Sequence, residues 1–130
     1  MKILLGYDGS NAAMDALKLA AKHGKAFNGT VYVIQSLSGG SEHDEEKIAA
    51  ADDQLSFAES LVTNAGVACE THLLVRGLPP GEDIVRFAEE KEIDTIIIGV
   101  RRRTQVGKML FGSTAAYVIL NAPCPVITIR

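Results

Sequence analysis

The sequence predicts an α/β fold, in which helices cover both faces of a five-stranded, largely parallel sheet. Five short runs of β-branched and aliphatic residues alternate along the chain with four segments of helical periodicity. One of these runs, Thr-Ile-Ile-Ile at 95–98, is continuously apolar, as in strands that are covered by helices on both faces. We therefore expect right-handed crossovers within one three-layer domain over residues 1–130, a length with room for one core.

The first half of the chain is expected to form two strand-and-helix pairs. A buried strand over 2–7 ends at Asp8-Gly9-Ser10, and Ser10 is the expected cap of a helix whose exit lies between Gly24 and Gly29. A second strand over 30–37 is followed by a helix over 45–65. The acidic, glycine-containing connection over 38–47 is interpreted as a solvated loop rather than as a lid.

The second half repeats the scheme. A third strand is expected over 67–75, and the turn at 77–81 leads into a helix that carries Ile84 and Phe87. The apolar strand over 94–99 is expected at the centre of the sheet. A helix that starts at Gly112-Ser113-Thr114 and a final strand, Val126, Ile127, Thr128 and Ile129, complete the chain.

Composition argues against several classes of partner and site. The formal net charge of -3 disfavours nucleic acid or anionic lipid as a partner. The opening apolar run is too short for a signal peptide or a membrane span, so we expect a cytoplasmic protein. Cys69 and Cys124 lack paired spacing and are expected to be buried, reduced thiols. The three histidines, His23, His43 and His72, share no metal-ligand spacing.

Two loops carry the candidate binding residues, because parallel sheets bind ligands beyond the carboxyl ends of their strands. The first is Asp8-Gly9-Ser10, and the second runs from Gly99 to Ser113. Gly99 would let the backbone approach a ligand closely, and Gly112-Ser113-Thr114 would place free amides and hydroxyls at a helix N-terminus, where anions bind. The cations between them are Arg101, Arg102, Arg103 and Lys108. These side chains could bind phosphate through charge-assisted hydrogen bonds. A solvated basic loop without a ligand is an equally supported alternative.

Motifs of common enzymes are absent from the sequence. It contains no G-x-S-x-G, H-E-x-x-H or G-x-G-x-x-G pattern, and Gly107-Lys108 is followed by Met109 instead of the Ser or Thr of a phosphate-binding P-loop. The second loop offers no carboxylate for magnesium, which leaves Asp8. We expect a protein that is not an enzyme, with slow nucleotide hydrolysis as the alternative.

Three segments together resemble the universal stress protein family over the whole chain. They are the opening Ile3-Leu4-Leu5-Gly6-Tyr7-Asp8-Gly9-Ser10, Gly99 with Gly112-Ser113, and the ending Asn121-Ala122-Pro123-Cys124-Pro125-Val126. The resemblance implies a Rossmann-like fold of the adenine nucleotide alpha hydrolase type with strand order 3-2-1-4-5. It also implies an adenine nucleotide, ATP, ADP or AMP, as ligand, with Mg as an optional companion of the nucleotide.

The resemblance also implies roles for single residues. Asp8 would lie near the ribose or base, with Tyr7 as a further nucleotide-binding residue. Ser36 would offer its backbone to adenine, and Gly99 would stand at the loop entry. Gly112, Ser113 and Thr114 would contact the phosphates, helped by Arg101, Arg102 and Arg103. One departure stands out, because Arg102 occupies the place of the second signature glycine. It would either block the pocket or replace backbone contacts to phosphate. Asp8 has a purely structural alternative as a cap of the first helix.

The last strand, 126–129, is apolar and would leave an uncovered sheet edge that invites pairing with another chain. The resemblance likewise implies a homodimer through this strand, unless Arg130 and the neighbouring helix shield it. We expect an adenine-nucleotide-binding stress-response or regulatory protein. The alternative is a nucleotide-independent dimeric interaction or chaperone-like module, for which Arg102 is the main support.

Overall fold

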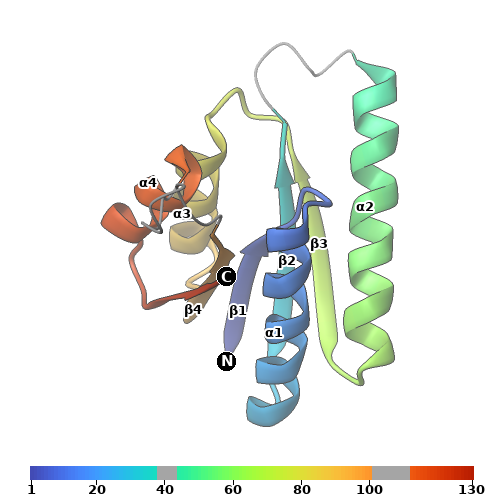
Figure 1. Cartoon of the computed structure of the whole chain (residues 1–130), viewed down its shortest axis with the longest axis vertical. Coiled ribbons are helices and arrows are strands. Elements are labelled where there is room, and N and C mark those ends of the chain that lie inside the picture. Colours follow the sequence, from blue (N-terminus) through green and yellow to red (C-terminus); the bar gives the residue numbers. More distant parts are fainter. Residues whose placement is uncertain (38–43, 101–111) are drawn as a thin grey trace, which may run out of the picture.

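The computed structural model describes residues 1–37, 44–100 and 112–130 (Figure 1). The elements in chain order are β1 (Lys2–Gly6), α1 (Asn11–Phe27), β2 (Thr30–Ser36), α2 (Glu45–Asn64), β3 (Ala68–Leu74), α3 (Pro80–Glu90), β4 (Thr95–Gly99), α4 (Ser113–Asn121) and β5 (Val126–Ile129). The predicted alternation of strands and helices is confirmed. Each strand end lies within one residue of its predicted position.

The sheet has the order β3-β2-β1-β4-β5, and each neighbouring pair is parallel. This order confirms the predicted fold class. The expectation that residues 94–99 form the central strand is wrong, because β1 lies at the centre and β4 lies between β1 and β5. A continuously apolar run signals that helices cover both faces, and every interior strand of such a sheet shares that property.

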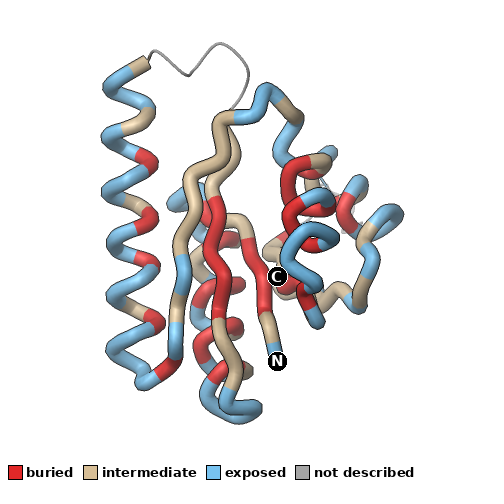
Figure 2. Tube along the Cα trace, turned by 180° about the vertical axis from the view of Figure 1, so that it is seen from behind, coloured by how far each residue is buried: buried red, intermediate tan, exposed pale blue. Residues whose placement is uncertain are grey.

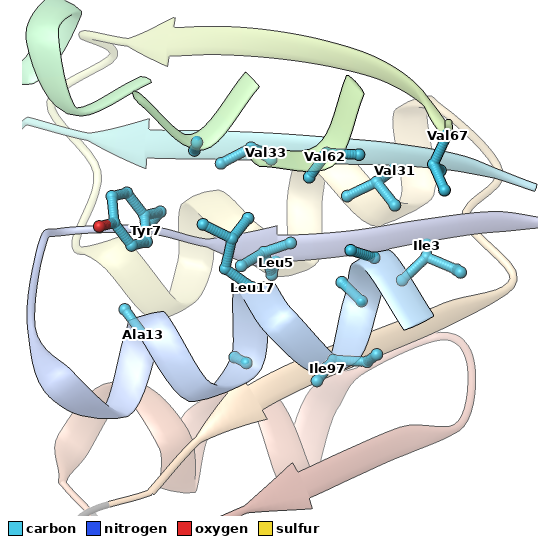
Figure 3. Packing of buried hydrophobic residues seen from close by; sticks show 14 of the residues in the cluster. Ile3, Leu5, Tyr7, Ala13, Leu17, Val31, Val33, Val62, Val67 and Ile97 are labelled. Atoms are coloured by element: carbon cyan, nitrogen blue, oxygen red, sulfur yellow. The ribbon is translucent and has the colours of Figure 1, made fainter. Parts of the chain in front are cut away.

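Two apolar layers hold the helices against the sheet. Alternate side chains of a strand point to opposite faces, so Leu5 packs with Leu17 of α1 and Val62 of α2, whereas Leu4 packs with Ile84 and Phe87 of α3. Figure 2 shows the buried residues concentrated along the inner strands and the sheet-facing sides of the helices. Figure 3 shows the first layer from close by.

Helix α1 ends between Gly24 and Gly29, as the glycine spacing predicted. It runs through Gly24 to Phe27, and Asn28 ends it in the left-handed conformation with φ 52°. A Cβ atom at Gly24 would lie 2.6 Å from Cγ1 of Val67. Gly24 therefore lets the helix approach the sheet closely and does not mark the helix end.

The two cysteines are free, as expected, but only partly buried. Burial, with added repulsion from Glu59 and Glu70, raises the pKa of Cys69 to about 11, and burial also raises the pKa of Cys124. The thiolate is the reactive form of cysteine.

In the described part of the chain, no helix combines the length and apolar character needed to span a bilayer.

The raised pKa of Cys69 should make this thiol react slowly with thiol reagents. At pH 8 in a Cys124→Ser variant, we expect the native protein to react with Ellman's reagent about 100-fold more slowly than the urea-unfolded chain, given the raised pKa. The absorbance of the released thiolate follows the reaction. Equal rates in the native and unfolded chain would contradict the burial seen here.

Candidate functional site

A pocket of about 450 Å³ opens where β1, β2 and β4 end. This volume falls within the ~300–1,000 Å³ typical of small-molecule sites. The lining residues come from six elements and the loops that adjoin them: Gly6, Tyr7, Asp8, Ser10, Ala12, Ala13, Ile34, Gln35, Ser36, Pro80, Ile84, Ile98, Gly99, Val100, Gly112, Ser113, Thr114 and Ala115. The strand order reverses between β1 and β4, so this is the crevice where open parallel sheets bind ligands.

The structure brings most of the predicted site residues together at this pocket. Its lining includes Tyr7, Asp8, Ser36, Gly99, Gly112, Ser113 and Thr114. Arg101, Arg102 and Arg103, together with Lys108, lie outside the residues that the structure describes. Whether Arg102 blocks the pocket or helps a ligand therefore stays a prediction.

The N-terminus of α4 forms one wall and has no side-chain cap from the residues that the structure describes. Gly112 is the N-cap residue, and no described side chain accepts a hydrogen bond there from the first-turn amides. The first amides of a helix lack intrahelical partners and carry partial positive charge. Together with the hydroxyls of Ser113 and Thr114, they give the pocket a set of donors suited to an anion.

The N-terminus of α1, which also borders the pocket, is already occupied by its own side chains. Ser10 Oγ accepts a hydrogen bond of 3.1 Å from the Ala13 amide, which confirms Ser10 as the predicted cap. Asp8 Oδ1 accepts a hydrogen bond of 2.9 Å from the Ser10 amide. Asp8 is thus part of a local turn and remains exposed beside the pocket.

Gly99 allows a close approach, but the partner is the protein itself. A Cβ atom at this position would lie 2.1 Å from the Ala12 carbonyl oxygen and 2.5 Å from its carbon. The structure thus gives a reason for glycine that does not depend on a ligand, and the expectation that Gly99 also lets a ligand approach stays a prediction. Glycine is needed here because the end of β4 packs directly against the first turn of α1.

Tyr7 follows β1 and is buried, with its ring 6.3 Å from that of Phe57 on α2 (centroid distance). In Figure 3 it continues the row that Ile3 and Leu5 form along β1, near Ala13 of α1. Burial and the neighbouring charge of Asp8 raise the pKa of Tyr7, so its phenol stays neutral. Tyr7 belongs to the pocket lining, and its ring packs in the apolar layer that covers the α1 and α2 face of the sheet.

The opposite end of the pocket is mostly apolar, and sequence analysis did not find it. Ile34, Ile84 and Ile98 line it, together with Pro80. The proline-rich turn at 77–81 was predicted to start a helix, and it does, with Pro80 as the first residue of α3. Nothing in the turn itself indicated that α3 would face the end of β2 across a pocket.

Sequence analysis also missed Asp83, a fully buried carboxylate behind this wall. Ser36 Oγ donates a hydrogen bond of 2.5 Å to Asp83 Oδ2, and Arg76 Nε donates one of 2.8 Å to Oδ1. A signal was present, because Asp83 precedes Phe87 by four residues, which places both on one face of the helix. Phe87 was named among the apolar residues of the predicted helix, and Asp83 is buried on the same face.

Comparison with known proteins decides the family of this chain. The sequence model described as the universal stress protein family matches residues 1–130. The chain belongs to the universal stress protein family. A universal stress protein of Methanocaldococcus jannaschii is 32% identical over an alignment that covers 99% of this chain and 81% of that protein.

Solved structures of universal stress proteins agree with the fold. One from Archaeoglobus fulgidus is 43% identical, covers 100% of this chain and 98% of that chain, and superposes with a TM-score of 0.90. A second structure of a universal stress protein from Archaeoglobus fulgidus is 40% identical, with the same coverage and a TM-score of 0.86. That second protein was solved in complex with dAMP.

Proposed function

We propose that this protein binds an adenine nucleotide in the pocket at the ends of β1, β2 and β4, and acts as a stress-response or regulatory protein. The observation that carries the proposal is the uncapped N-terminus of α4, whose amides and hydroxyls line the pocket. The dAMP complex of a universal stress protein that is 40% identical to this chain supports the same ligand class.

The pocket divides into an anion end and a base end. The anion end is the first turn of α4, with Gly112, Ser113 and Thr114. The base end combines the isoleucine wall with the backbone of Ser36. On the β1 side of β2, the Tyr7 amide donates a hydrogen bond to the Ile34 carbonyl. On the β3 side, the Leu37 amide donates one to the Leu74 carbonyl. Alternate residues of a strand direct their backbone groups to opposite neighbours, so Ser36 directs its own toward β1.

The register leaves the Ser36 backbone beyond the paired part of β1. The last residue pair between β1 and β2 is Gly6 with Ile34, whereas β2 remains paired with β3 as far as Ser36. The amide and carbonyl of Ser36 therefore face the open end of the pocket and not a paired strand. They offer one donor and one acceptor to the edge of a base, in support of the expectation that Ser36 contributes through its backbone.

The bound nucleotide can be identified directly. Freshly purified protein is unfolded, and the released small molecules are separated by chromatography; we expect AMP, ADP or ATP. Nucleotide-free protein should then show a higher thermal midpoint with AMP than without it, because a ligand that binds only the native state stabilises that state. No released nucleotide and an unchanged midpoint would contradict the proposal and favour the interaction module.

We propose further that the protein binds nucleotide without turning it over. Asp8, the carboxylate in the pocket lining, accepts a hydrogen bond from the Ser10 amide. Phosphoryl transfer normally relies on a metal ion held by such carboxylates. We expect no phosphate release from ATP and Mg²⁺ above the buffer rate. Metal-dependent release that Asp8→Ala abolishes would overturn this part of the proposal.

We propose that β5 forms a homodimer edge to edge with a second copy. Ile96 and Val100 of β4 donate hydrogen bonds of 3.0 and 2.8 Å to the carbonyls of Pro125 and Ile129. The intervening residues Val126 and Thr128 therefore direct their backbone groups away from β4. Such an outward edge is a template for another strand.

The dimer proposal predicts that loss of the outward Thr128 amide prevents dimer formation. Thr128→Pro removes an outward amide while it leaves the hydrogen bonds to β4, and proline is tolerated at such edge positions. We expect this variant to be a folded monomer in sedimentation velocity, whereas the control Thr128→Val, which keeps the amide, should remain a dimer. A dimeric Thr128→Pro variant would place the interface elsewhere.

A further inference from the structure

We propose that Asp83 is a specificity-determining residue for the base: it fixes the Ser36 hydroxyl as a pure hydrogen-bond acceptor, which favours a base with an amino group over one with a carbonyl. The inference rests on the proposed nucleotide-binding function. Asp83 does not line the pocket and acts through Ser36, so it is a positioning residue.

The position of the Asp83 carboxylate directs the Ser36 hydroxyl proton toward Asp83 Oδ2. Asp83 has no exposed surface, and an ionised carboxylate only accepts hydrogen bonds. Its Oδ1 accepts a hydrogen bond of 2.8 Å from Arg76 Nε, and its Oδ2 accepts one of 2.5 Å from Ser36 Oγ. A serine hydroxyl has one proton and two lone pairs. With the proton directed to Asp83, only lone pairs remain for the pocket.

The surroundings hold this arrangement in place. Arg76 supplies the positive charge that a buried carboxylate requires, and its Nη1 donates a hydrogen bond of 2.8 Å to Glu90 Oε1 on the next turns of α3. The Asp83 amide donates a hydrogen bond of 3.0 Å to the Pro79 carbonyl in the first turn of α3. The strong acceptor is thus anchored to both the loop before α3 and the helix itself.

The chemistry of the pocket then separates two purines. Ser36 lies at the base end, beside the isoleucine wall. Adenine carries an exocyclic amino group, which donates to a lone pair, whereas hypoxanthine carries a carbonyl oxygen at the same position, which would face a lone pair without a proton between them. A polar group left without its partner in a buried site weakens binding strongly.

The test compares three probes by calorimetry: AMP, IMP and ribose 5-phosphate, which lacks a base. We expect the wild type to bind AMP at least about tenfold more tightly than IMP, the cost of one unmet hydrogen bond. In Asp83→Asn, the new amide donates to Ser36 Oγ and frees its proton, so the AMP to IMP ratio should fall, while the Ser36 backbone keeps the part of the preference that it provides. Ser36→Ala removes the hydroxyl and should lower the ratio likewise.

Ribose 5-phosphate separates a specificity role from a structural one. Its affinity should stay within about twofold of wild type in both variants, because its contacts lie at the α4 end, where the charged phosphate binds. Glu90→Gln keeps an oxygen acceptor for Arg76 Nη1 at an exposed position and should leave the ratio unchanged. Val62→Ala, which destabilises the core on the other face of the sheet, should also leave it unchanged.

Each contrary outcome has a distinct meaning. Equal weakening of all three probes in Asp83→Asn and Ser36→Ala, or an unchanged AMP to IMP ratio in Ser36→Ala, would overturn the inference while the nucleotide site stands. A wild-type protein that binds neither AMP nor ribose 5-phosphate would overturn the proposed function, and this inference with it.

Discussion

Ser113→Pro is expected to lower the affinity for AMP at least about 100-fold, because it removes two donors of the anion end at once. One donor is the Ser113 hydroxyl and the other is its amide, the first of the uncapped α4 turn. The helix itself should survive the change. Proline is favoured at the first helical position, and Gly112 already has the extended backbone that a residue before proline requires, with φ -65° and ψ 167°.

The control for this prediction is Ser113→Ala, which removes the hydroxyl alone. It should weaken AMP binding by about tenfold, the value of one hydrogen bond to a charged group. Both variants should retain the circular dichroism and the thermal midpoint of the ligand-free wild type within a few degrees. Wild-type affinity in Ser113→Pro would show that the amides of α4 do not hold the phosphate.

Gly99→Val is expected to lower the free energy of unfolding by about 3 kcal/mol or more, since side chains forced into filled space cost this much. Its Cβ alone would lie 2.1 Å from the Ala12 carbonyl oxygen, which belongs to helix backbone and has little room to move. The end of β4 and the start of α1 would have to separate, and both line the pocket. Urea denaturation measures the loss.

Gly112→Ala, at the other signature glycine that the structure describes, is the control for this prediction. Among the described residues, no atom lies within 4 Å of a Cβ atom built there, and its φ is -65°. We expect its free energy of unfolding to change by less than about 0.5 kcal/mol. Equal stability of Gly99→Val and wild type would mean that β4 and α1 are not packed as the structure has them.

The sequence predicted the fold well because the deciding signals are local. Periodicity separated strands from helices, and Ser10 was recognised as a helix cap because its side chain bonds to Ala13, three residues away. The position of β4 in the sheet could not be derived in this way. An apolar run reports that both faces are covered, and β1 and β4 share that property although they occupy different places.

Sequence analysis identified the pocket residues that follow a strand end or start a helix. It missed those whose role depends on a contact with a residue far away in the chain. Ser113 and Thr114 could be assigned to the pocket because a helix N-terminus is readable in the sequence. The packing of Gly99 against Ala12 could not be predicted, since the two residues lie far apart in the chain. Asp83 was passed over because its partners, Arg76 and Ser36, come from another loop and another strand.

The most direct test of the central claim is an isothermal titration of nucleotide-free protein with AMP and ATP. We predict saturable binding of one nucleotide per chain, with a Kd in the micromolar range, which corresponds to about -8 kcal/mol. Heats that do not differ from dilution at millimolar nucleotide would contradict the account. The pocket would then not be a nucleotide site, and a nucleotide-independent interaction module would be the better description of this universal stress protein.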